Sequence, residues 1–83
     1  MSQVKVYGAD WCSMTQQTLS YLDEKNVPYD YVNIEQDDRA REWVKRQNEG
    51  KERKPTLDVG GEILSEPSDS ELESVLRRKH VVG

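Results

Sequence analysis

The chain holds a single cysteine, Cys12, at the start of a segment whose pattern is typical of a helix. A thiol at the first turn of a helix lies close to unpaired backbone N–H groups, and the helix dipole stabilises its thiolate. The thiolate is the form that attacks disulfides, so this position favours thiol–disulfide exchange. Thr15, one turn further on, could donate its hydroxyl to the anionic sulfur, whereas Asp10 would oppose the thiolate unless its carboxylate points away.

A purely structural role for Cys12 is the alternative, because most lone cysteines are inert and buried in a core. The loop of Gly8, Ala9 and Asp10 before the predicted helix favours a functional role, since ligands bind at such loops in open α/β sheets. Trp11 is then either a packing residue or an aromatic side chain that faces the substrate.

The elements that must position this cysteine follow from the hydrophobic pattern. Strands are predicted at 4–7, 29–34, 56–59 and 62–65, and Gly60-Gly61 joins the last two as a hairpin. Helices are predicted over 13–25, from Asp37 or Asp38 to just before Gly50, and after a capping box at 68–71. Their inner positions are Met14, Thr18, Leu19, Leu22, Ala40, Trp43, Val44, Gln47, Leu72, Val75 and Leu76.

This order, β-α-β-α-β-β-α, predicts an α/β fold with a mixed four-stranded sheet and helices on both faces. Because helices join the first three strands, we expect those strands to be parallel neighbours. Asn26 is a residue that adopts the left-handed conformation at the end of the first helix, and Pro28 forbids its continuation.

The size and composition of the chain argue against several classes of function. A chain of 83 residues predicts one domain, residues 1–83, with one modest core. The net charge of −4 argues against a general binder of nucleic acid or of anionic membranes, and no apolar run is long enough to span a bilayer. Because the chain has one cysteine and "MSQVKVYG" resembles no signal peptide, we expect a cytoplasmic protein without an internal disulfide.

The segment "RKPTL" at 53–57 is the second informative stretch. Pro55 either starts a strand with an ordinary trans peptide, which is the commoner case, or forms a cis peptide that holds a strand edge beside the thiol. Arg53 and Lys54 are either solvated loop charges or a source of positive charge at the thiol.

Four segments, in order and covering nearly the whole chain, resemble the glutaredoxin family of the thioredoxin fold: "VKVYGADWCSMT", "VPYDYVNI", "KPTLDVGGEIL" and "EPSDSEL". The last is similar to small bacterial members of the mycoredoxin and NrdH type. The resemblance implies that Trp11 and Cys12 open a redox site and that Pro55 is a cis-proline facing Cys12. It also implies that Ser68 and Asp69 hold the γ-glutamyl end of glutathione.

Several residues of the predicted site differ from the pattern of the family. The motif is C-S-M-T, neither the dithiol C-P-Y-C nor the monothiol C-G-F-S. Ala9 stands where glutathione-binding members often carry a lysine that contacts a glutathione carboxylate. Arg53-Lys54 replaces the Thr-Val before the proline, and Ser65-Glu66 replaces a Gly-Gly pair.

We therefore predict a monothiol glutaredoxin-like thiol–disulfide oxidoreductase that acts on mixed disulfides between proteins and a small thiol. Its co-substrate is glutathione or another low-molecular-weight thiol, and we expect a monomer with no obligatory cofactor and no metal site. The predicted catalytic residues are Cys12 and Thr15, and the predicted thiol-binding residues are Trp11, Arg53, Lys54, Pro55, Ser68 and Asp69.

Two other functions stay open on the sequence. One is a glutathione-dependent [2Fe–2S] cluster carrier, in which Cys12 of two protomers ligates the cluster. The other is a non-catalytic interaction domain with a thioredoxin fold.

Overall fold

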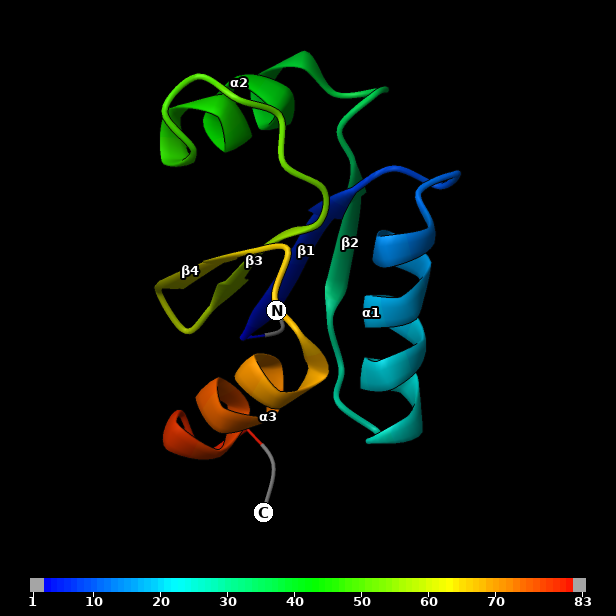
Figure 1. The fold of residues 1–83 in the computed structure, drawn as a ribbon, viewed down its shortest axis with the longest axis vertical. Helices are drawn as coiled ribbons and strands as arrows, with labels where there is room; N and C mark the ends of the chain where they lie inside the picture. The colour runs from blue at the N-terminus through cyan, green and yellow to red at the C-terminus, as the bar shows by residue number, and fades with distance from the viewer. Residues whose placement is uncertain (1–2, 82–83) are drawn as a thin grey trace.

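The secondary structure follows the predicted order, β-α-β-α-β-β-α (Figure 1). The computed structural model describes residues 3–81, so residues 1, 2, 82 and 83 of the predicted domain lie outside the described range. The strands are β1 (Val4–Gly8), β2 (Asp30–Asn33), β3 (Thr56–Val59) and β4 (Glu62–Ser65). The helices are α1 (Ser13–Glu24), α2 (Asp38–Gln47) and α3 (Asp69–Arg78).

The sheet is mixed, as predicted, but the orientation of β3 differs from the prediction. The strand order is β2-β1-β3-β4; β1 and β2 are parallel, whereas β3 is antiparallel to both β1 and β4. The reason is the place of α2, which lies beyond the carboxyl ends of β1 and β2 instead of returning along the sheet (Figure 1). The chain therefore enters β3 at the end where β1 finishes, and Tyr7 is paired with Thr56.

The core lies mainly between one face of the sheet and the helices α1 and α3. Alternate residues of β1 and β3 point to this face, where they are fully buried: Val4, Val6, Leu57 and Val59. Leu22, Val27, Leu72, Val75 and Leu76 complete the same cluster. Each such side chain contributes about 1.5–3 kcal/mol by leaving water. On the other face, the ring of Tyr7 packs on that of Trp43 of α2, with centroids 4.6 Å apart.

Two of the helix positions that were predicted to face inward are exposed in the structure. Met14 is 40% exposed, and Thr15 is buried in its place because it points under the end of β1 at Gly8. Gln47 is exposed, whereas Asn48, the residue that caps α2, is buried. Apolar periodicity misses both because the residues that are buried are polar.

The helix ends confirm the predicted caps. Asp37 rather than Asp38 caps α2, since its carboxylate accepts the Ala40 N–H at 3.0 Å. Asn26 has φ 57°, and Ser68 and Glu71 form both halves of the predicted capping box. Within residues 3–81, none of the helices has the length and apolar character needed to cross a bilayer.

Candidate functional site

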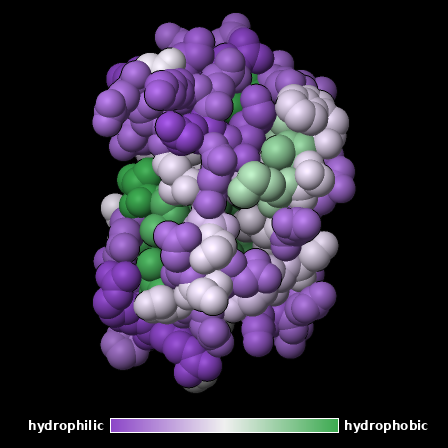
Figure 2. Space-filling model, viewed as in Figure 1, coloured by the Kyte–Doolittle hydropathy of each residue, from purple (hydrophilic) through white to green (hydrophobic). Residues whose placement is uncertain are grey.

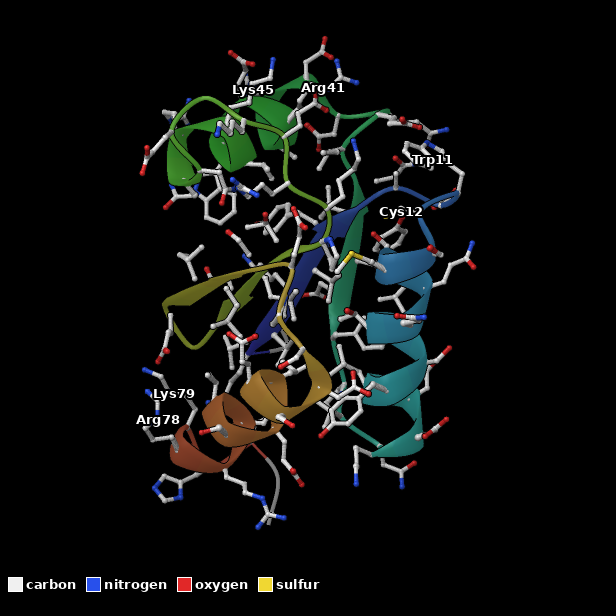
Figure 3. All side chains as sticks on the ribbon, viewed as in Figure 1. Trp11, Cys12, Arg41, Lys45, Arg78 and Lys79 are labelled. Carbon is white, nitrogen blue, oxygen red and sulfur yellow. The ribbon has the colours of Figure 1, made fainter. Side chains whose placement is uncertain are left out.

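Cys12 is the residue that caps the N-terminus of α1, and its side chain is half-buried. The chain turns tightly before it, with the Cys12 N–H donating to the carbonyl of Ala9 at 3.1 Å. Its Sγ lies 3.8 Å from the carbonyl oxygen of Lys54, within reach of a weak S–H···O hydrogen bond. Figure 3 shows the sulfur directed away from α1 toward the chain that enters β3.

The surroundings of the sulfur favour its ionised form. Partial burial raises the pKa of the Cys12 thiol, but the N–H and hydroxyl of Thr15, the N–H of Met14 and the ammonium of Lys54 together hold it below its ordinary value. Three of these groups come from the first turn of α1, where backbone donors have no partner within the helix. The site can therefore supply a nucleophilic thiolate at a lower pH than a free cysteine.

Thr15 is held directly beneath the end of β1. Its side chain is fully buried, and within the described part of the chain its hydroxyl has no hydrogen-bond partner while the thiol is neutral. An unpaired buried hydroxyl is costly, but the same hydroxyl lowers the pKa of Cys12 and thus finds its partner in the thiolate. Gly8 makes room for it, because a Cβ at Gly8 would lie 2.5 Å from the Thr15 Oγ1.

Trp11 joins two other loops above the sulfur. Its indole Nε1 donates to the Glu35 carboxylate, just after β2, at 2.8 Å. The ammonium of Lys54, just before β3, lies 5.3 Å from the centroid of the Trp11 rings, as in a cation–π contact. The indole is 64% exposed, and in Figure 2 a pale and light-green area marks the region where Figure 3 labels Trp11 and Cys12.

Asp10 does not point freely at the thiol. Its carboxylate accepts the hydroxyl of Tyr31 at 2.7 Å. Burial, and then the carboxylate of Asp10, raises the pKa of Tyr31, so the phenol stays protonated and remains a donor. Asp10 is thereby engaged by a neutral partner beside Cys12, which limits its opposition to the thiolate.

A buried polar network fixes the segment that carries Lys54. The Lys54–Pro55 peptide is cis, as the family resemblance implies. The Thr56 hydroxyl donates to the carbonyl of Arg53 at 2.7 Å, and the amide of Asn48 donates to the Thr56 hydroxyl at 3.2 Å. Asn48 also bonds to Ser65 of β4 and to the backbone of α2, so it joins three elements around this segment.

Within residues 3–81, the hydrogen bonds and charges that act on the Cys12 sulfur come from residues other than Arg53, Ser68 and Asp69. Arg53 forms an ion pair with Glu66 at 3.5 Å. Ser68 is engaged with Glu71 in the capping box, and Asp69 is exposed and lines a groove against α1. Cys12, Thr15, Trp11, Lys54 and Pro55 are thus brought together, whereas Arg53 and Ser68 have other partners.

Three residues around the site were not predicted from the sequence: Tyr31, Glu35 and Asn48. Gly8, expected in the loop before α1, is instead the last residue of β1, and Thr15 packs against it. A signal existed for Gly8, because the alternation of Val4, Val6 and Gly8 places it on the face that α1 covers. Among residues 3–81, no three or more His, Cys, Asp and Glu side chains gather closely enough to hold a metal ion.

We expect Lys54→Met to raise the pKa of Cys12, because it removes the nearby ammonium while keeping the apolar stem. We expect the alkylation rate of Cys12 at low pH to fall less in this variant than in one that loses the contacts from α1. The effect should weaken at high ionic strength, because salt screens the ammonium. Alkylation rates measured against pH give the thiol pKa. Lys51→Met, in the same loop, is the matched control; an equal change in both variants would contradict a local effect.

This fold and site define a thioredoxin-like protein with a cysteine at the start of its first helix. A thioredoxin-like protein matches the structure with a TM-score of 0.82 and 22% identity, over 93% of this chain and 97% of the other. The glutaredoxin of Archaeoglobus fulgidus matches with a TM-score of 0.76 and 18% identity, over 93% and 88%. A buckwheat glutaredoxin–glutathione complex matches with 0.75 and 14%, over 99% and 83%. At these identities the likeness shows the fold.

Sequence comparison shows the family. The Glutaredoxin family profile matches residues 4–64. Mycoredoxin 1 of Corynebacterium glutamicum is 40% identical over 57 residues, which are 69% of this chain and 70% of that protein. The chain therefore belongs to the glutaredoxin family, and its chemistry is that of the thiol–disulfide oxidoreductases.

Proposed function

We propose that this protein exchanges mixed disulfides between proteins and a small thiol, with Cys12 as its one reacting sulfur. The observation that supports this most directly is the thiol at the start of α1, whose pKa is lowered by donors from Thr15 and Met14. A thiolate with no second cysteine in the chain cannot close an internal disulfide, so the reaction needs the small thiol as co-substrate.

The proposed reaction has two exchange steps. In the first, the Cys12 thiolate attacks the small-thiol sulfur of a mixed disulfide; the old S–S bond breaks, and the target protein leaves as a thiolate that takes a proton from water. In the second, a thiolate of another small-thiol molecule attacks the adduct and releases the Cys12 thiolate together with the small-thiol disulfide. Each step forms one S–S bond and breaks one, so the electrons balance.

The residues around Cys12 would each contribute in a different way to binding the small thiol. The Lys54 carbonyl lies beside the sulfur, where the backbone of a bound thiol could pair with it as a short added strand. The exposed indole of Trp11 offers an apolar surface next to the sulfur. Pro55 would hold this edge in place. Glutathione or another small thiol is the co-substrate class that these contacts accept.

Intact-mass measurement tests the proposal. The reduced protein is incubated with the disulfides of glutathione and of other low-molecular-weight bacterial thiols, and we expect an adduct of one small thiol on Cys12. A following addition of the same reduced thiol should remove the adduct, and Cys12→Ser should form none. A chain that forms no adduct with any of them, and whose thiol titrates like free cysteine, would refute the proposal.

A further inference from the structure

The ammonium of Lys54 is attracted by several groups at once. It lies 5.3 Å from the centroid of the Trp11 rings and 3.9 Å from Oε1 of Glu52, which stands two residues earlier in the same loop. It also lowers the pKa of the Cys12 thiol, so the thiolate is a third group that attracts it. The Lys54 side chain is 19% exposed, and a charge in such a place is screened less than one in open solvent. How strongly Glu52 holds the ammonium therefore affects how much of its charge acts on the sulfur.

The same oxygen of Glu52 has a second cation, Arg41 of α2. The Arg41 Nε lies 3.6 Å from Glu52 Oε1, and the Arg41 Nη1 lies 3.7 Å from Oδ1 of Asp38. Within residues 3–81 the buried Nε has no hydrogen-bond partner, so the Glu52 carboxylate is the group that offsets the burial of this part of the guanidinium. In Figure 3 the chain that leads into β3 passes between Arg41 of α2 and Cys12 of α1. Arg41 thus connects α2 to the loop that carries Lys54.

The other charged groups near the thiol have partners of their own. Each is held by an ion pair or a hydrogen bond: Arg53 with Glu66, Glu35 with Trp11, and Asp10 with Tyr31. Neither Arg41 nor Glu52 is among the groups that act directly on the pKa of Cys12. The geometry therefore gives Arg41 a route to the thiol that runs through Glu52 and Lys54.

We infer that Arg41 is a positioning residue for the reacting thiol: it engages the Glu52 carboxylate and so leaves the Lys54 ammonium available to the sulfur. A carboxylate that is shared between two cations attracts each of them less than it would attract one alone. Without Arg41, Glu52 would hold Lys54 more tightly, and less of the positive charge would act on the thiolate. This inference rests on the proposed function, because Cys12 is the reacting sulfur there, but its test needs no disulfide substrate.

Arg41→Gln is expected to raise the pKa of Cys12 and to slow its alkylation by iodoacetamide about two- to threefold at pH values below that pKa, the scale of a partly exposed ion pair. Arg41→Lys keeps the positive charge and should keep most of the wild-type rate. Alkylation rates against pH, followed by intact mass, give the pKa, and urea denaturation checks that each variant is folded.

Arg39→Gln is the matched control. It makes the same change of charge on the same helix, and in the part of the chain that the structure describes Arg39 takes part in no ion pair. Arg39→Gln should leave the pKa of Cys12 unchanged.

Two further backgrounds test the route through Glu52 and Lys54. In Lys54→Met, Arg41→Gln should no longer change the pKa of Cys12, because the ammonium through which it acts is gone. In Glu52→Gln, Arg41→Gln should also have no effect, because the shared carboxylate is gone. Glu52→Gln by itself should lower the pKa of Cys12, since it frees the ammonium for the thiolate.

The outcomes separate the inference from the proposed function. If Arg41→Gln titrates like the wild type, or raises the pKa of Cys12 equally in the Lys54→Met background, the inference is overturned. If Arg41→Gln does not fold, Glu52→Gln decides in its place: it should lower the pKa where Lys54 is present and leave it unchanged in Lys54→Met. The proposed function fails separately, when Cys12 forms no adduct with any disulfide, whatever pKa these variants show.

Discussion

Gly8→Ala is expected to lower the free energy of unfolding by about 1–3 kcal/mol, the range typical of an overpacked core. The new Cβ would lie 2.5 Å from Oγ1 and 2.6 Å from Cγ2 of Thr15, closer than non-bonded atoms approach. Thr15 cannot easily rotate away because β-branched side chains in helices have few rotamers. Either β1 or the first turn of α1 must move, and that turn carries Cys12. Urea denaturation measures the loss.

A double-mutant cycle makes this result specific to the contact. Thr15→Ala removes both clashing atoms and leaves only a Cβ, which is 3.1 Å from the position that the new methyl group would take at Gly8. Gly8→Ala/Thr15→Ala should therefore recover most of the stability lost by Gly8→Ala, with a favourable coupling between the two sites. A Gly8→Ala protein as stable as the wild type, or a double variant without recovery, would show that the packing at this point is looser than the structure indicates.

Thr15→Val is expected to raise the pKa of Cys12 and to slow its reaction with disulfides about three- to tenfold at pH values below that pKa. Valine has the shape of threonine but cannot donate a hydrogen bond to the thiolate. A hydrogen bond to a charged group contributes about 1.5–3 kcal/mol, and the higher nucleophilicity of a less acidic thiolate offsets part of its loss. Alkylation rates against pH measure the pKa, and exchange with a small disulfide measures the rate.

The sign of the pH effect follows from the direction of the pKa shift. The thiolate of Cys12 is present above its lowered pKa and is lost as the pH falls through it. In Thr15→Val the same loss of reactivity should occur at a higher pH, whereas the two proteins should react similarly well above both pKa values.

Stability measurements separate this effect from misfolding. Thr15→Val removes a buried hydroxyl that has no partner, within the described residues, while the thiol is neutral. The variant should thus be as stable as the wild type or more stable at low pH. Thr15→Ser keeps the hydroxyl and should keep the thiol pKa. If Thr15→Val titrates like the wild type, the hydroxyl does not act on the sulfur.

Local patterns in the sequence predict most of the elements and part of the site. Strand alternation, the capping box at Ser68 and the left-handed residue Asn26 are signals that act over a few residues, and the structure confirms them. The pairing of Cys12 with Thr15 is equally local, because one helical turn separates them. The cis peptide before Pro55 follows from the family resemblance, not from local pattern.

The rest depends on contacts between distant segments. Trp11 meets Glu35 across 24 residues, and Asp10 meets Tyr31 across 21. The orientation of β3 depends on where α2 lies relative to the sheet. The sequence pattern within α2 does not indicate that position. The buried Asn48 was missed because its position is set by hydrogen bonds to β3 and β4 rather than by hydrophobicity.

The donors around Cys12 also affect how its adduct breaks down. A sulfur that is stable as an anion is a good leaving group, because thiols of lower pKa depart faster from a disulfide. The Thr15 and Met14 contacts that lower the pKa of the Cys12 thiol would thus weaken the bond between Cys12 and a captured thiol. An incoming thiol would then attack the small-molecule sulfur and expel Cys12. The first turn of α1 would in this way direct the second exchange as well as the first, and keep the adduct short-lived.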